Sequence, residues 1–304
     1  MTTINWRTTV REGVTRAAVL IFCSVFVAPD RAYAQETQSP DPANQALVLG
    51  VNAGLGALVA AVGRIISNKP VRNAAFFGAL GGTASYIGKR VIARSDSRTN
   101  LLGREYSAAG ASVVANASSG LGPLDRFVFP YGPLRFYMDR SSSQSFSAKL
   151  DVATTLETAW VLHKGGIRLD TKRTISSGAP VFTVAAEKEG DVQLIDVGGS
   201  QIAGVVLHRD RTSYISEATQ TIDRTLGHEL VHVAQYDFSF IALAAPVEKS
   251  ILQQTTAGKW INRYVDLGLN VPLWSALNVM IRYQNRPWEI EAVTFSHLHD
   301  TPNR

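Results

Sequence analysis

The chain has 304 residues, of which 45% are hydrophobic and 18% are charged, and its net charge is +5. This length and composition are typical of a globular protein with one large domain or two modest ones and a sizeable core. The small positive charge comes without a run of lysines or arginines, so nothing in it indicates binding to nucleic acid.

Residues 1–34 have the three parts of an export signal. A basic leader precedes an apolar run at residues 17–28, which is too short to span a bilayer comfortably. Ala32 and Ala34 are the small residues expected just before a cleavage site at Gln35. We therefore predict a signal peptide and an exported protein, periplasmic or attached to a membrane of the cell envelope. The alternative is that the segment stays as an uncleaved membrane anchor.

The only cysteine, Cys23, lies inside the apolar run of this signal. Phe22 before it is too bulky for a typical lipoprotein processing site, so we expect no lipid anchor there. The mature chain would then contain no disulfide, no thiolate metal site and no cysteine nucleophile. Its stability would depend on its core and on any metal that it binds.

A polar, proline-containing linker at residues 35–45 is followed by a region rich in glycine and alanine at residues 46–120. Two uncharged segments, residues 46–63 and 74–88, are joined by a basic turn and predict a helical hairpin. We expect this hairpin, residues 46–88, to associate with a membrane. The alternative is a soluble pair of helices packed tightly against the rest of the protein.

Glycine pairs support close packing of these helices. Gly50 and Gly54 are four residues apart, as are Gly78 and Gly82, and such spacing lets two helix backbones approach closely. Residues 101–117 predict a third helix rich in small residues.

From about residue 124 the pattern changes to short runs of apolar, β-branched and aromatic residues between breaks of Gly, Ser and Asp. These runs predict six short, mostly antiparallel strands between residues 127 and 208. They comprise residues 126–139, 145–162, 167–177, 180–187, 191–198 and 202–208.

A helical period returns after His208, with Asp223 expected near the start of the first helix and later helices at residues 247–268, 272–284 and 286–299. The predicted fold class is α+β. An N-terminal helical region precedes one domain, residues 121–304, in which a sheet is followed by helices.

The first of these helices contains the stretch "TLGHELVHVAQYDF", in which His228, Glu229 and His232 spell H-E-x-x-H. Histidines at i and i+4 lie on one face of a helix, so their imidazole nitrogens can converge on one Zn²⁺. The glutamate at i+1 cannot easily bind the same ion, but it can hold a water molecule and take its proton. The spacing predicts His228 and His232 as metal ligands and Glu229 as general base. The structural alternative is a pair of surface histidines beside a glutamate.

The sequence "GHELVHVAQ" at residues 227–235 resembles the active-site helix of zincin metallopeptidases. Within these, gluzincins take a third ligand from a later helix with the motif E-x-x-A-[DN]-x-F-A. The sequence "EIEAVTFS" matches this motif at Glu289, Ala292 and Phe295 and departs from it at Val293 and Ser296. In that family the polar residue at the position of Val293 implies a hydrogen bond that supports the site, and this chain either lacks that bond or makes it with another residue.

Two glutamates compete for the role of third ligand. Glu289 and Glu291 are two residues apart, about 200° around a helix, so they cannot both face one ion. Glu289 shares its side of the helix with small residues, whereas Glu291 lies beside Trp288 and Phe295. We predict Glu289 as the ligand, with Glu291 as the alternative.

The resemblance implies a zinc-dependent peptidase of the cell envelope, in which metal-activated water attacks a peptide bond of a peptide or protein substrate. In such families the strand before the active helix, here residues 202–208, often runs along the substrate cleft. Two other functions remain open from the sequence. One is a non-catalytic envelope protein in which zinc holds helices together. The other is a membrane-interacting module built on the hairpin.

Overall fold

The computed structural model describes residues 42–94, 99–140, 145–163, 167–184, 215–270 and 286–296, without the side chains of residues 42–43 and 215–225. The predicted export signal lies outside the described residues, as do the predicted strands at residues 191–198 and 202–208 and the predicted helix at residues 272–284. These remain predictions.

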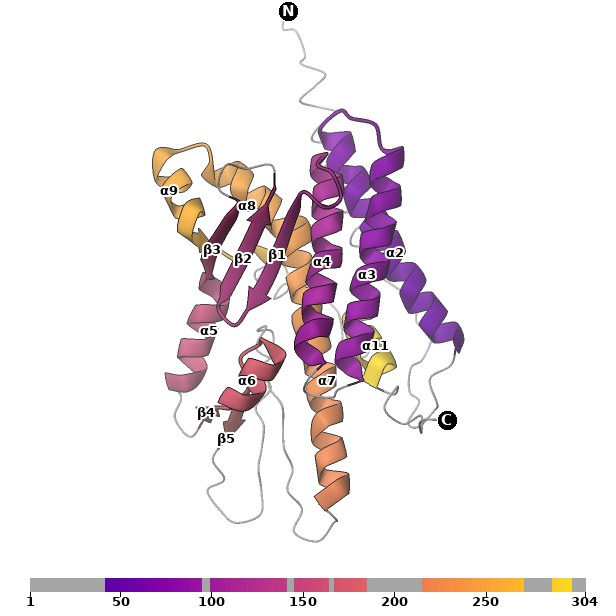
Figure 1. The fold of residues 1–304 in the computed structure, drawn as a ribbon, viewed down its shortest axis with the longest axis vertical. Helices are drawn as coiled ribbons and strands as arrows, with labels where there is room; N and C mark the ends of the chain where they lie inside the picture. The colour runs from indigo at the N-terminus through magenta and orange to yellow at the C-terminus, as the bar shows by residue number, and fades with distance from the viewer. Residues whose placement is uncertain are drawn as a thin grey trace, which may run out of the picture.

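Three long helices form an N-terminal bundle, which confirms the helical prediction for this region (Figure 1). They are α2 (Pro42–Ile66), α3 (Arg72–Ala93) and α4 (Asn100–Ser119). Helix α3 packs between the other two. Helix α4 ends at Gly120, which adopts a left-handed conformation (φ 80°) that costs least for glycine.

Glycines bring the backbones of α2 and α3 together, although not all of those predicted. A side chain at Gly56 would collide with the backbone of Gly78, and one at Gly82 with the backbone of Asn52. The prediction is therefore confirmed for Gly78 and Gly82. It is wrong for the pair at positions 50 and 54, where an added Cβ would meet nothing within 4 Å. The reason is rotation of α2, which turns Gly56 and Asn52 toward α3.

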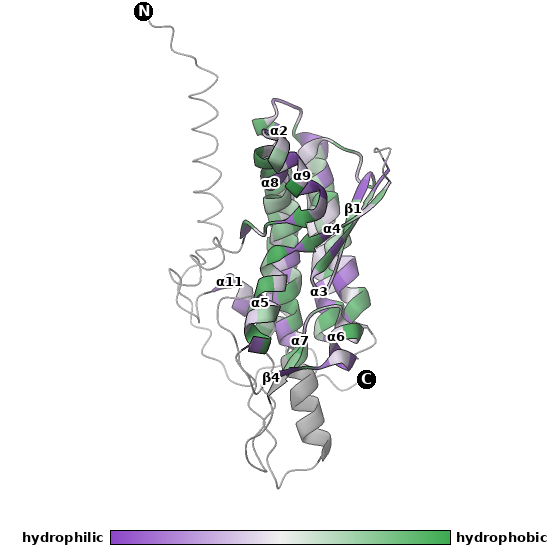
Figure 2. Cartoon of the chain, turned by 90° about the vertical axis from the view of Figure 1, so that its left-hand side faces the viewer, coloured by the Kyte–Doolittle hydropathy of each residue, from purple (hydrophilic) through white to green (hydrophobic). Residues whose placement is uncertain are grey.

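The main sheet is small and mixed, with strand order β1-β2-β3-β6. Strands β1 (Arg126–Tyr131), β2 (Leu134–Asp139) and β3 (Phe146–Asp151) are antiparallel neighbours, and β6 (Val265–Asp266) adds in parallel to β3. A separate antiparallel pair contains β4 (Ile167–Leu169) and β5 (Phe182–Val184). Figure 2 shows the sheet at one side of the long helices, with β1 beside α4.

Two of the predicted strand runs contain helices, and the strand prediction is wrong there. Helix α5 (Val152–His163) follows β3 directly, and α6 (Thr171–Ser177) follows β4. Each begins after an aspartate that caps it: Asp151 accepts a hydrogen bond from the Thr154 amide at 3.2 Å, and Asp170 from the Arg173 amide at 3.0 Å. A satisfied N-terminus outweighs the weak strand preference of the threonines that follow.

The C-terminal part is built around α7 (Ile215–Ser239), which continues through a π-helical turn (Phe240–Ala244) into α8 (Ala245–Leu252). Asp223 lies inside α7, so its predicted place near the helix start is wrong. The predicted helix at residues 247–268 is divided into α8 and α9 (Thr256–Tyr264), and β6 ends it. The last described helix is α11 (Pro287–Ser296).

Helix α7 crosses the inner faces of α3 and α4, and α11 packs against α7, α3 and α2. The core between them is apolar. Its fully buried members include Ile92 from α3, Val231 and Ala234 from α7, and Ala292 and Phe295 from α11. Residues from the bundle and from both C-terminal helices thus share one core.

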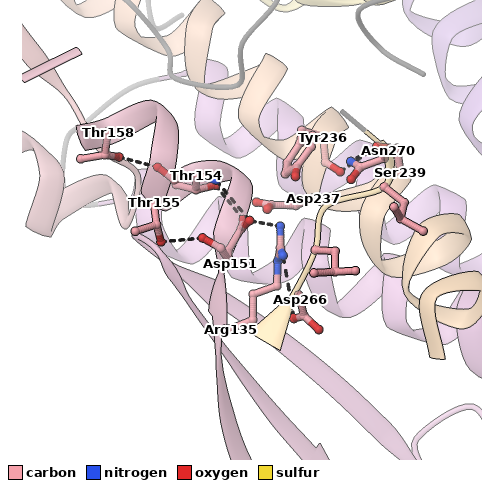
Figure 3. Close-up of polar contacts among 12 residues, drawn as sticks. Arg135, Asp151, Thr154, Thr155, Thr158, Tyr236, Asp237, Ser239, Asp266 and Asn270 are labelled. Atoms are coloured by element: carbon pink, nitrogen blue, oxygen red, sulfur yellow. Dashed lines mark hydrogen bonds and ion pairs between the residues drawn. The ribbon is translucent and has the colours of Figure 1, made fainter. Parts of the chain in front are cut away.

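Buried ion pairs lie on the other side of α7. Arg104 of α4 forms an ion pair with Asp237 of α7 at 2.8 Å. Arg135 of β2 forms an ion pair with Asp151, the last residue of β3, at 2.5 Å (Figure 3). Its guanidinium also lies 3.6 Å from the ring centre of Phe240, in the π-helical turn that follows α7. Buried charges persist only when they are paired, so the first pair holds α4 against α7 and the second holds β2 against β3.

Candidate metal centre

The H-E-x-x-H segment lies in the middle of the buried part of α7. Leu226, Leu230 and Val231 pack into the apolar core and hold the helix in place. His228 and His232 are half-buried on another side of the same helix. The segment is therefore part of a core helix, and its two histidines lie at the edge of the core.

Helix α11 brings a glutamate to these histidines. The Nε2 atoms of His228 and His232 are 3.2 Å apart. The Oε2 atom of Glu289 is 3.2 Å from Nε2 of His232 and 3.6 Å from Nε2 of His228. The three residues form a group that can hold a metal ion.

The spacing of the three donor atoms fits zinc. In a tetrahedral site with bonds of about 2.0–2.1 Å, two ligand atoms are separated by about 3.3–3.4 Å. The observed separations of 3.2, 3.2 and 3.6 Å bracket that value. Two imidazoles and one carboxylate are also a donor set that zinc accepts.

The structure separates the two glutamates between which the sequence left a choice. Glu289 lies with the histidines. Glu291 points instead to α2 and α3, where it contacts Lys89 and Asn52. The division follows from the helix, which turns side chains two positions apart to opposite sides.

Gln235 sets the orientation of the His232 ring. Its amide nitrogen donates to two acceptors, the carbonyl oxygen of Trp288 at 3.0 Å and Oε2 of Glu291 at 2.7 Å. The amide oxygen therefore faces Nδ1 of His232, 2.9 Å away, and must accept a hydrogen bond from it. With the proton on Nδ1, the Nε2 atom keeps a free lone pair directed at Glu289 and His228.

The charge of Glu289 also acts on His232. Burial lowers the pKa of this histidine, but the hydrogen bond and the negative charge of Glu289 outweigh burial and raise the pKa to about 9. Glu229 adds a smaller contribution in the same direction. A cation is therefore favoured between these groups, whether it is a proton or a metal ion.

Other histidines and tyrosines near the two motifs lie away from the group or outside the described residues. Tyr236 is buried toward the sheet, with the guanidinium of Arg135 5.7 Å from its ring centre. Tyr283, His297 and His299 lie outside the described residues.

Val293 is exposed on α11. A hydrogen bond to His232 comes instead from Gln235, which was part of the quoted motif but had no predicted role. No sequence motif predicted a role for Lys89 or Asn52, because only the packing of the helices brings them to Glu291.

Comparison with known proteins does not identify the chain. No protein-family model, no curated protein and no solved structure matches it. The functional argument therefore depends on the geometry of the His228, His232 and Glu289 group.

Proposed function

We propose that this chain is an exported zinc-dependent peptidase with His228, His232 and Glu289 as ligands. The observation that carries the proposal is the triangle of donor atoms at separations of 3.2, 3.2 and 3.6 Å. The resemblance of residues 227–235 and 289–296 to gluzincin motifs supports the same function. Composition alone would not be expected to bring residues 227–235 and 289–296 together at these distances.

A catalytic role is favoured over a purely structural metal because the site is incomplete and reachable. Among the residues that the structure describes, three protein donors lie at the site, and this number leaves a fourth position for water, as catalytic zinc requires. The side chains of His228, His232 and Glu289 retain 16%, 22% and 12% of their exposure, so solvent reaches the group.

Bound zinc would supply Lewis acidity and would lower the pKa of water at the open position. Glu229 follows His228 directly and is half-buried on the same helix. In the proposed reaction its carboxylate takes the proton from the attacking water and passes it to the leaving amine. The substrate is a peptide or protein in the cell envelope.

The test is the variant Glu229→Gln. We expect peptide hydrolysis to fall by about 10²–10⁴-fold while one zinc per chain is retained, because the ligands are unchanged. Cleavage of a fluorogenic peptide library and zinc content by mass spectrometry give the two readouts. Undiminished hydrolysis by the purified variant would remove the peptidase assignment. A wild-type protein that keeps its zinc and cleaves no peptide would instead support the non-catalytic alternative.

A second proposal concerns the outer face of α2 and α3, which we assign to a membrane. In the described part of the chain, two helical stretches are long and apolar enough to cross a bilayer, Asn44–Ile66 and Leu226–Leu252. The second is 72% buried in the protein and is a core helix, whereas the first is only 28% buried. The first stretch therefore presents most of its apolar surface outward.

The arrangement of residues in α2 and α3 supports this assignment. Small residues fill the helix interface, while Leu47, Phe76, Leu80 and Ile87 are exposed. Membrane helices commonly place small residues at their contacts and large apolar ones toward lipid. The exposed Lys69 in the turn would add attraction to anionic lipid headgroups.

Liposome flotation tests the membrane assignment with residues 35–304, so that the leader does not contribute. We expect the variant with Phe76, Leu80 and Ile87 changed to serine to lose most binding to anionic vesicles. The matched control changes Leu156, Ile175 and Trp260, which are at least as exposed and lie on other elements, to serine and should still float. Equal flotation of the two variants would argue against the proposed face.

A further inference from the structure

We infer that Glu291, Lys89 and Asn52 are positioning residues of the metal centre, so that zinc affinity depends on how α2 and α3 dock against α11. The inference rests on the proposed zinc site. It goes beyond that site because it assigns a role to helices that carry none of its ligands.

The first step links the ligand His232 to Glu291. Gln235 accepts the hydrogen bond from Nδ1 of His232 and donates its amide nitrogen to Oε2 of Glu291 at 2.7 Å. The amide cannot rotate by 180° without facing two acceptors with its oxygen. Glu291 therefore determines which end of Gln235 faces the histidine.

The second step links Glu291 to the bundle. Its other oxygen, Oε1, accepts hydrogen bonds from Nζ of Lys89 at 2.6 Å and from Nδ2 of Asn52 at 2.7 Å. Lys89 also donates to Oδ1 of Asn52 at 2.6 Å, and the Asn52 amide donates to the carbonyl of Val48 at 2.8 Å. Each partner thus holds the other in one orientation.

Burial makes this network rigid. The side chains of Lys89 and Glu291 are only 4% and 12% exposed. A buried ion pair broken on one side leaves an uncompensated charge, which is strongly unfavourable. Breaking the ion pair between Lys89 and Glu291 is therefore unfavourable as long as α3 and α11 are docked. Separation of the two residues would leave the Gln235 amide free to rotate.

The network should increase the affinity of the site for a metal ion. Fixing the proton on Nδ1 keeps the lone pair of Nε2 aimed at the other two donors, which raises the affinity of the histidine for a metal. Residues that hold ligands in this way typically change metal affinity about 10–100-fold when they are mutated. We expect effects of that size from residues of α2 and α3 as well.

The experiment measures zinc affinity of the full chain by competition with a chromogenic chelator, together with the visible spectrum of the cobalt-loaded protein. Lys89→Met, Asn52→Ala and Gln235→Met should each weaken zinc binding about 10–100-fold and alter the cobalt bands. The control is Asn116→Ala. Asn116 is also a buried asparagine whose amide binds backbone carbonyls, but it lies at the far end of α4.

A double variant separates positioning from loss of folding. Lys89→Met leaves the charge of Glu291 buried, whereas Lys89→Met with Glu291→Gln removes both charges and should fold at least as well. Reduced zinc affinity in the folded double variant supports the inference.

Three other outcomes would overturn the inference, each for a different reason. Wild-type affinity in the folded double variant and in Gln235→Met overturns the positioning role and leaves the proposed function standing. A wild-type protein that binds no zinc overturns both. An equal loss of affinity in Asn116→Ala would show a general effect of buried substitutions and would also overturn the inference.

Discussion

Single residues in this protein acquire their roles from what surrounds them rather than from their type. Glu289 and Glu291 are two positions apart and chemically identical, yet one joins two histidines and the other an ammonium and two amides. The difference is the side of α11 from which each projects. Gln235 is a third example, since the donation of its amide nitrogen to Glu291 turns its oxygen toward His232.

Glu105 of α4 is a partly buried acidic residue whose surroundings change its pKa. Within the described part of the chain, its Oε2 atom is buried without a hydrogen-bond partner. Burial raises the pKa of Glu105 to about 7, against the lowering effect of Arg104 and with a further rise from Asp237. The folded state therefore holds a proton that the unfolded state releases near pH 4.5.

The stability of the folded state should therefore depend on pH through Glu105. Between pH 4.5 and about 7 the folded state binds more protons, so the contribution of Glu105 to stability falls as the pH rises and is lost above pH 7. We expect Glu105→Gln to be more stable than the wild type at pH 8, by on the order of 2 kcal/mol, and similar at pH 4.5. Urea unfolding at the two pH values checks this, and parallel pH profiles would contradict it.

At the scale of elements, helix starts and helix contacts determine the architecture. The aspartates at positions 151 and 170 begin helices where the residue pattern favoured strands. In the N-terminal bundle, glycines permit contacts that no side chain would allow. The glycines at positions 103 and 110 weaken α4 by propensity, but they meet α3 at close range and are required there.

Two glycines in the bundle provide a matched test of this packing. Gly82→Ala places a methyl group against the backbone of α2 and should destabilise the protein by about 1–3 kcal/mol. Gly54→Ala makes the same chemical change at an open helix position and should be neutral or stabilising by up to about 1 kcal/mol. Thermal unfolding of the two variants measures the contrast. Equal effects would mean that α2 and α3 do not approach as described.

At the scale of the whole molecule, the candidate metal centre lies at a junction. Two of its residues come from α7 and one from α11, while α2 and α3 hold the supporting network. Arg104 joins α7 to the bundle through Asp237, and Arg135 of the sheet lies over Phe240 in the turn that follows α7. A metal bound at this junction would stabilise the docking of several elements at once.

Metal binding should therefore be visible in global stability. Zinc at 100 times its dissociation constant would add about 2.7 kcal/mol to the free energy of unfolding. We expect added zinc to raise the Tm of the metal-stripped wild type, and chelation to lower it again. The variant His228→Ala should lose the increase because one donor is missing. An equal zinc-induced shift in this variant would place the ion elsewhere in the protein.

The helical part of the fold could be predicted because its signals are local. Runs of small and apolar residues between breakers predict α2, α3 and α4 without knowledge of their partners. The sheet was predicted less well, since β-branched residues at positions 152–162 also fit a capped helix and only local hydrogen bonds decide between the two. The exposed Gly54 shows the same limit, because a glycine spacing does not state which side of a helix faces its neighbour.

The sequence was sufficient to predict two histidines that could share one metal ion. The i, i+4 spacing of His228 and His232 is a property of any helix, so their convergence needed no tertiary information. Tertiary structure alone decided which glutamate joins them and which residues support them. Glu291, Gln235 and Lys89 are distant in the chain, and only the packing of α11 between α7 and the bundle brings them within hydrogen-bonding distance.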